Sequence, residues 1–119
     1  PTPAEARVCA LTTWIATQVL GRKIESWMES DVKLYGRLCV AVWTGNAIVW
    51  SRRYSDRMSD PFAPEVLQTI VHEVAHGLTP APGHGPEFHD ALERSAGRVA
   101  CLLFSKGPAA QAAVNKVAS

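Results

Sequence analysis

The sequence lacks several features that would place it at once in a class of protein. Its three cysteines, Cys9, Cys39 and Cys101, are odd in number and far apart, with no Cys-x-x-Cys pair, which argues against a cysteine zinc ribbon and a disulfide framework. No apolar run approaches the length of a transmembrane helix, and the first residues lack the pattern of a secretion signal. We therefore expect buried thiols, a reducing cytoplasmic setting and no membrane partner.

A strong net charge is also absent. Twelve Lys and Arg stand against 11 Asp and Glu, so the chain as a whole exerts little pull on nucleic acid or anionic membranes. Seven of the basic residues fall between Arg22 and Arg57, which keeps a local DNA-binding face open as a weakly supported alternative. A length of 119 residues with 47% hydrophobic composition fits one domain, residues 1–119, which we expect to be a monomer.

The first half of the chain predicts a helix followed by strands. Apolar residues recur at helical spacing over 3–20, and a short strand is predicted at 23–30. Two runs rich in β-branched and aromatic residues, 37–43 and 47–51, flank Thr44-Gly45-Asn46. They predict a hairpin and hence a small antiparallel sheet.

The second half predicts two further helices and an α+β fold. The predicted elements are a polar loop between Arg52 and Pro64, a helix from Pro64 to His76 that ends at Gly77, an irregular segment at 79–85, and a helix from Pro86 that Gly97 interrupts. The tail from about 105 to 119 follows a Gly-Pro break. It is expected to fray or to form a short separate helix.

An H-E-x-x-H pattern lies on the first of these two helices. At about 100° per residue, His72 and His76 are roughly 40° apart on one face, so their imidazoles can converge on one ion. Polar residues share that face, while Val66, Ile70 and Val74 occupy the opposite arc, which we expect to pack into the core. The two histidines therefore face a polar cleft.

A third ligand must come from another segment, because hydrolytic zinc sites use three protein ligands and keep one position open. His84 follows a proline- and glycine-rich loop that can reverse the chain, and it is our predicted third ligand for Zn²⁺. His89 is a competitor, and Glu87 and Glu93 are weaker ones, since glutamate completes other H-E-x-x-H sites.

Glu73 is the predicted catalytic base. It lies about 60° around the helix from His76, so it can reach a metal-activated water without occupying a ligand position. Zinc acidifies such a water and polarises a carbonyl, while a carboxylate takes the proton and passes it to the leaving amine. No oxyanion donor is evident among Arg52, Arg53 and Tyr54. Asp90 could orient a ligand histidine, although an exposed helix charge is the favoured interpretation.

The predicted hairpin offers a way to bind substrate. An exposed strand can pair with an extended peptide through backbone hydrogen bonds, which needs no particular peptide sequence. Trp43 and Trp50 could flank such a cleft, although strand tryptophans are more often core residues.

Together these features resemble the SprT-like zinc metalloproteases. The motifs appear as "TIVHEVAH" and "GHGPEF", and the resemblance covers about 4–103 in layout but only 68–88 in motif detail. It implies a zincin-like fold in which the three histidines bind zinc and Glu73 is the base. One departure is the absence of the cysteine-rich ribbon that many members carry, and in DNA-directed relatives the DNA contacts lie largely outside the catalytic core.

The function expected from the resemblance is a zinc metalloendopeptidase that cleaves a protein or peptide substrate. Three alternatives stay open. The chain could be a DNA-associated SprT-like protein in which nucleic-acid binding dominates, a non-catalytic module that zinc stabilises, or a hydrolase of a non-peptide amide. A structural zinc site normally closes with a fourth protein ligand, often cysteine, and none lies near in the sequence.

Overall fold

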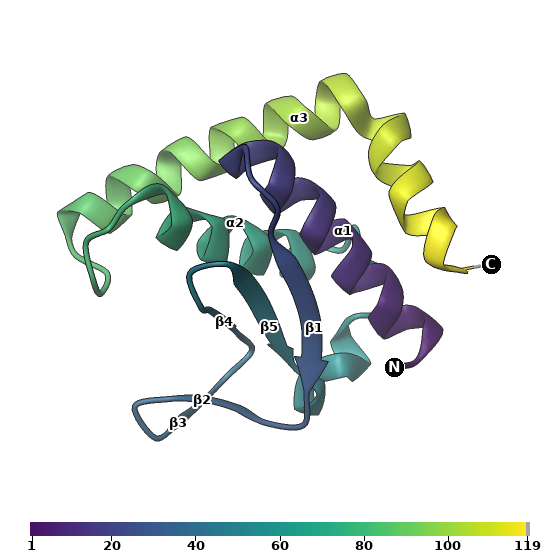
Figure 1. The fold of residues 1–119 in the computed structure, drawn as a ribbon, viewed down its shortest axis with the longest axis horizontal. Helices are drawn as coiled ribbons and strands as arrows, with labels where there is room; N and C mark the ends of the chain where they lie inside the picture. Colours follow the sequence, from purple (N-terminus) through teal and green to yellow (C-terminus); the bar gives the residue numbers. More distant parts are fainter. Residues whose placement is uncertain (119) are drawn as a thin grey trace.

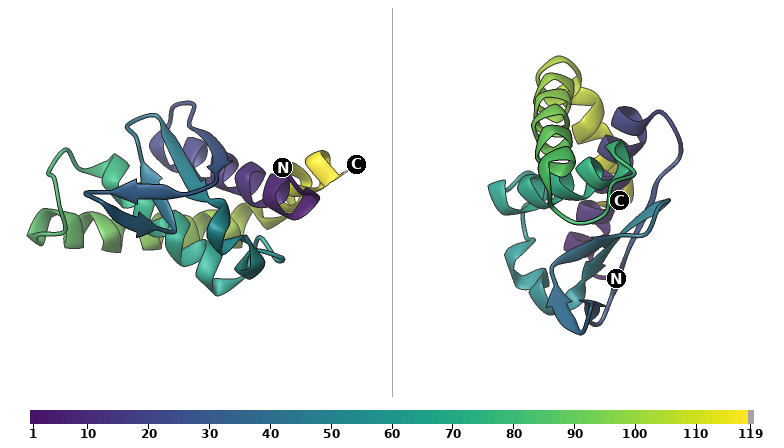
Figure 2. Two further views of the ribbon diagram at one scale, coloured as in Figure 1. Left: turned by 90° about the horizontal axis from the view of Figure 1, so that it is seen from below. Right: turned by 90° about the vertical axis from the view of Figure 1, so that its left-hand side faces the viewer.

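The computed structural model describes residues 1–118, and side chains as far as residue 117, and it confirms the α+β prediction. The chain folds into a layer of helices and a layer of short strands (Figure 1). Figure 2 shows the strands along one side of the helices. Within the described residues, no helix combines the length and apolar composition needed to span a bilayer.

Helix α1, Pro3–Leu20, has the predicted bounds and a sequence-encoded start. The backbone N–H of Glu5 donates to Oγ1 of Thr2 at 3.1 Å, and the N–H of Thr2 donates to the Glu5 carboxylate at 2.8 Å. This reciprocal capping box satisfies two helix N–H groups that otherwise lack partners. Gly21 ends the helix in the left-handed conformation, with φ of 71°.

The main sheet is mixed, so the prediction of an antiparallel sheet is wrong in part. Its order is β1 (Glu25–Glu29), β5 (Ala47–Ser51), β4 (Ala41–Trp43). Strands β4 and β5 form the predicted antiparallel hairpin, but β1 pairs parallel with β5. The chain leaves β1, makes an excursion, and returns through β4 on the far side of β5, so β1 and β5 run in the same direction. All five residues of the central strand β5 are buried.

The excursion is a second hairpin that was not predicted. Residues 37–43 are two strands and not one: β3, Arg37–Cys39, pairs with β2, Val32–Leu34, while β4 pairs with β5. Tyr35 and Gly36 connect β2 to β3 with φ of 53° and 78°. Two central residues with positive φ are the mark of a type I′ hairpin turn. The hairpin projects away from the helices (Figure 1).

The predicted loop after β5 forms a 3₁₀ helix, η1, Arg52–Arg57, that is tied to the start of α1. Nε of Arg52 donates to the carboxylate of Glu5 at 3.0 Å. The Glu5 side chain is only 3% exposed, and the hydrogen bond from the Thr2 backbone, with a further one from Arg52, holds its pKa below the usual range.

The lowered pKa of Glu5 predicts a stability that depends on pH. A carboxyl whose pKa is lower in the folded state stabilises the fold above its unfolded pKa, and this contribution is lost as the pH falls through the folded pKa. We expect Glu5→Gln to lower the free energy of unfolding at pH 7 by about 1–2 kcal/mol. Urea unfolding from pH 7 to pH 3 measures it: the gap to wild type should close in acid, and Glu93→Gln, an exposed control, should show no gap.

Helix α2, Pro64–Leu78, carries the H-E-x-x-H pattern with its apolar face inward, as predicted. Val66, Ile70 and Val74 are at most 1% exposed and belong to the main core. Gly77 does not end the helix, which continues to Leu78. A Cβ on Gly77 would lie 2.8 Å from a methyl carbon of Leu20 and 3.1 Å from the Trp43 ring. The glycine is therefore a close-packing residue.

Substituting Gly77 should accordingly destabilise the protein. The Leu20 methyl group can move, but the Trp43 ring sits under the Arg22 guanidinium at 5.6 Å and has less freedom. We expect Gly77→Ala to cost about 1–3 kcal/mol, as overpacking does. Gly97→Ala is the matched control, because no heavy atom of the described neighbours lies within 4 Å of its Cβ position. It should raise stability by up to about 1 kcal/mol, the helix propensity gained. Thermal unfolding compares them, and equal effects would contradict the packing argument.

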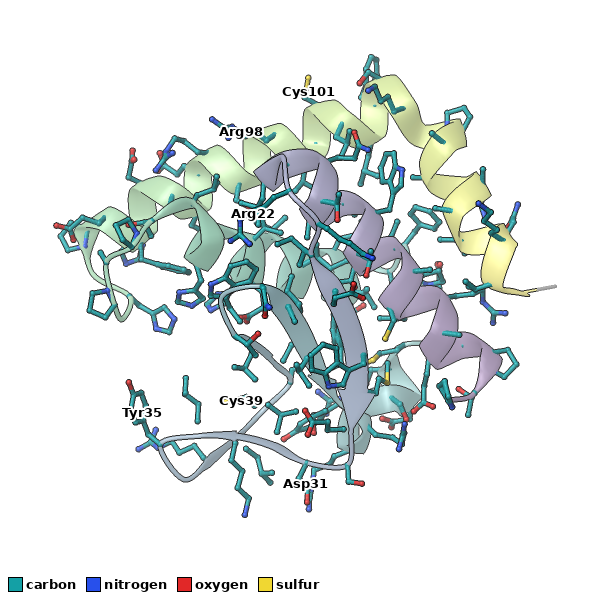
Figure 3. The ribbon with its side chains drawn as sticks, in the orientation of Figure 1. Arg22, Asp31, Tyr35, Cys39, Arg98 and Cys101 are labelled. Atoms are coloured by element: carbon teal, nitrogen blue, oxygen red, sulfur yellow. The ribbon has the colours of Figure 1, made fainter. Side chains whose placement is uncertain are left out.

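Helix α3, Pro86–Ala118, is long and kinked, with non-helical angles at Lys106. Gly97 does not interrupt it, contrary to the prediction. Of the two alternatives for the tail, the structure shows a helix, and its Ala110 and Val114 are buried in the main core. Cys101 is exposed on the outer side of α3 (Figure 3), so the prediction of buried thiols is wrong for this residue; the other two cysteines are half-buried.

Candidate metal centre

His72, His76 and His84 converge at one end of α2. One potential ligand atom from each lies within 4.8 Å of the other two, and the ring centroids are 5.0–5.2 Å apart. The Nε2 atoms of His76 and His84 are 3.3 Å apart. The structure thus brings the three predicted ligands together, in an arrangement that can hold a metal ion.

The polypeptide positions these rings from two segments. The apolar face of α2 is fixed in the core, which leaves its polar face, with Gln68, Thr69 and the first two histidines, lining a cleft. The loop after α2 then reverses direction, and Gly83 adopts φ of 75° directly before His84. A residue with a side chain would be strained at that φ, so glycine is suited to this turn.

The phenyl ring of Phe88 packs against all three imidazoles. Its ring centroid lies 4.9 Å from that of His72, 4.4 Å from that of His76 and 4.7 Å from that of His84. The side chain is 3% exposed and packs with Ala75 and Ala91, where α2 and α3 cross. Helix α3 is held against α2 there, and Ser95 Oγ donates to the carbonyl of Val71 at 2.8 Å. Phe88 therefore couples the helix crossing to the geometry of the histidines.

The electrostatics favour neutral imidazoles. Burial, with additional repulsion from His72 and His84, lowers the pKa of His76 to about 4. Burial also lowers the pKa of His72, and His84 adds to the effect. A histidine must be neutral to present a ring nitrogen to a metal, so these rings are ready to bind one at physiological pH.

Glu73 lies beside the histidines in the wall of the cleft. Its carboxylate oxygen is 3.9 Å from Nε2 of His72, and the residue is 6% exposed. Burial raises the pKa of Glu73 to about 8, while a hydrogen bond from the Trp43 backbone opposes that rise. A cation held by the imidazoles would favour the ionised carboxylate, because nearby opposite charge stabilises it.

The donor set fits zinc. Zn–N bonds of about 2.0–2.1 Å in a tetrahedral site place two nitrogens roughly 3.3–3.4 Å apart. The Nε2 separation of His76 and His84, 3.3 Å, matches that spacing, although two neutral rings can also share a hydrogen bond at this distance. Within the part of the chain that the structure describes, no fourth His, Cys, Asp or Glu joins the group. Three protein ligands are one fewer than a structural zinc site normally has.

A cleft of about 590 Å³ opens in front of the histidines. Strand β4 lines one wall with Val42 and Trp43, and the hairpin β2–β3 contributes Leu34 and Tyr35. Pro82 and Gly83 of the loop close the other end. Glu73 and all three histidines reach the same space, so a molecule in the cleft would contact both kinds of group.

The rival ligands lie outside the histidine group in the described structure. His89 is exposed, and neither it nor Glu87 or Glu93 belongs to the group. Asp90 pairs with Arg94 at 3.1 Å as an exposed helix charge, as the favoured interpretation had it. Trp50 is a core residue whose Nε1 donates to Thr12 at 3.2 Å.

Two parts of the site were missed from the sequence. The contact of Phe88 with the three histidines was not predicted, although Phe88 ends the quoted motif "GHGPEF". The hairpin β2–β3, which lines the cleft, was also missed, because Tyr35-Gly36 was not recognised as a turn. The glycine of this pair, between two short runs that contain β-branched or other apolar residues, was a signal for it.

Comparison with known proteins gives no further assignment: no protein-family model, no curated protein and no solved structure matches the chain.

Proposed function

We propose that the protein is a zinc-dependent metalloendopeptidase with a zincin-like fold, related to the SprT-like enzymes. The observation that carries the proposal is the convergence of three histidines and one buried carboxylate in a single open cleft. Two imidazoles with lowered pKa values provide neutral ligands, and the raised pKa of Glu73 marks a proton-transfer group.

His72, His76 and His84 would hold the ion. When bound, zinc supplies Lewis-acid chemistry, lowering the pKa of a water molecule and polarising the scissile carbonyl. Glu73 accepts the proton of the attacking water and delivers it to the nitrogen of the leaving amine. Without a metal, burial raises the pKa of Glu73; a cation held by the imidazoles would favour the ionised carboxylate, which is the form that takes the proton.

Strand β4 supports a peptide as the substrate. It is the edge strand of the order β1-β5-β4 and lines the cleft with Ala41, Val42 and Trp43. Its outer backbone groups can pair with an extended chain, which would carry a peptide bond past the histidines. The Trp43 N–H of this edge already bonds Glu73, so a peptide would pair with the remaining outer backbone groups of β4, close to the metal site.

The other functions have less support. Three of the basic side chains between Arg22 and Arg57 are paired with carboxylates: Lys23 with Glu25, Arg52 with Glu5 and Arg53 with Asp31. This pairing weakens the electrostatic argument for DNA. A purely structural zinc site would be expected to have a fourth protein ligand, which the described residues do not add to the group.

Anomalous X-ray scattering at the zinc edge, on crystals grown without added metal, is the direct test. A peak bonded to the three histidines, together with cleavage of an unfolded protein that stops on chelation, is the expected result. A peak completed by a fourth protein side chain would point to a structural site. Bound zinc in the three-histidine site without cleavage of any peptide or unfolded protein would contradict the peptidase proposal.

A further inference from the structure

Exposed apolar side chains are concentrated on one element beside the metal centre. Of the seven large hydrophobic residues that are exposed in the described chain, four fall within 34–40. They are Leu34, Tyr35, Leu38 and Val40. Such side chains are unfavourable in water when they cluster, and clusters of this kind usually mark binding surfaces. Three of the four line the cleft that contains the histidines.

The register of the hairpin sorts its residues between two faces. Val32 pairs with Cys39, Leu34 with Arg37, and Lys33 with Leu38. Side chains alternate along a strand and paired residues share a face, so Val32, Leu34, Arg37 and Cys39 lie on one face, while Lys33 and Leu38 point the other way. Val32 is buried against Ala47 and Val49, which directs that first face toward the body of the protein and the cleft.

Tyr35 occupies a turn position that its side chain does not favour. Its φ is 53°, and within the described residues it is the sole non-glycine residue with positive φ. Asn, Asp or Gly would fit such a turn without the backbone strain that a bulky residue incurs. The ring is 96% exposed, so packing does not compensate for this strain (Figure 3). Tyr35 also lines the cleft, and strained residues of this kind cluster at sites that bind ligands.

We infer that Leu34 and Tyr35 of the hairpin β2–β3, together with Val40, which joins the hairpin to β4, form an apolar subsite for a large hydrophobic side chain of an extended polypeptide bound along β4. The inference rests on the proposed function and specifies its substrate class. Leu, Phe and Met side chains are mostly buried in folded proteins, so a site that requires them in an extended segment selects unfolded chains.

The arrangement of the cleft explains why one peptide would use both elements. A strand paired with β4 presents alternate side chains to the two sides of the sheet, about 7 Å apart along the chain. The hairpin shares the cleft with β4, so side chains on that side of the peptide meet its apolar face. Backbone pairing is indifferent to sequence, and the hairpin therefore supplies the selectivity.

Single substitutions in the protein test the subsite. Each variant is assayed on three peptides that are identical except at one position, which is Leu, Phe or Ser. Leu34→Ser removes an apolar group from the cleft face, and Tyr35→Asn removes the ring while fitting the turn. We expect each to lower the ratio of kcat/KM for the Leu or Phe peptide to that for the Ser peptide by about tenfold. Leu38→Ser is the matched control, since Leu38 is 38% exposed and Leu34 47%, on opposite faces of the same hairpin. Its ratio should equal that of wild type.

A binding measurement separates failure of the subsite from failure of the peptidase proposal. Fluorescence anisotropy of the labelled Leu and Ser peptides with zinc-loaded Glu73→Gln protein needs no cleavage. Preferential binding of the Leu peptide that Leu34→Ser or Tyr35→Asn abolishes, and Leu38→Ser preserves, supports the subsite even if wild type cleaves nothing. Equal binding of both peptides, or equal losses in Leu34→Ser and Leu38→Ser, overturns it. Circular dichroism verifies that each variant is folded.

Discussion

Replacing Glu73 with glutamine is expected to lower kcat for peptide cleavage by about 10²- to 10⁴-fold while zinc stays bound. The amide has nearly the shape of the carboxyl group but cannot accept the proton of the attacking water. The three imidazoles are untouched, since Glu73 is not one of the grouped ligands. Initial rates on a fluorogenic peptide, together with zinc content by mass spectrometry, measure the two effects on the same sample.

Glu87→Gln is the matched control for this experiment. It makes the same chemical change at an exposed carboxyl that begins α3 close to the loop, but outside the histidine group. Its activity should stay within about twofold of wild type. Loss of zinc from Glu73→Gln would mean that the carboxyl holds the metal rather than the proton, and full activity would remove Glu73 from the mechanism altogether.

Alanine at His72, His76 or His84 is expected to weaken zinc binding by more than about 100-fold. Loss of a partner that merely orients a ligand costs 10–100-fold in affinity, so loss of a ligand itself should exceed that range. Zinc at about 100 times its Kd stabilises wild type by about 2.7 kcal/mol, and this increment should vanish in each variant. Thermal unfolding with and without zinc reports the increment, and competition with a chelating dye reports the affinity.

His89→Ala serves as the control, because His89 is exposed and lies outside the group despite being only five residues from His84. It should bind zinc as wild type does. If His89→Ala loses zinc and His84→Ala keeps it, then His89, and not His84, is the third ligand. Retention of zinc by all four variants would place the metal elsewhere on the protein.

The histidine centre was predictable because its information is local. Helical periodicity alone places His72 and His76 on the polar face of α2, and loop composition alone suggests that the chain turns back before His84. The structure confirms that these three residues meet. The role of Glu73 and the identity of the metal stay predictions, because geometry bears on them without deciding the chemistry.

The sheet was less predictable because strand pairing is decided by distant contacts. The residues of β1 do not indicate that this strand pairs with β5 or that the two strands are parallel. Residues 37–43 divide at Val40 because Arg37–Cys39 pair with β2 and not with β5. In the sequence, the sign of that pairing is the Tyr35-Gly36 turn. The prediction that α2 ends at Gly77 was wrong for a related reason. A glycine that ends a helix cannot be distinguished in sequence from one that leaves room for a neighbouring ring, here that of Trp43.

The course of α3 has a consequence for the order in which the protein matures. Its first turns carry Phe88 beneath the histidines, and beyond the bend at Lys106 its last turns bury Ala110 and Val114 in the main core beside α1. During synthesis the metal-binding end is therefore made before the segment that completes the core has emerged. Metal binding at full affinity should then require that these last turns of α3 have been made and have packed into the main core.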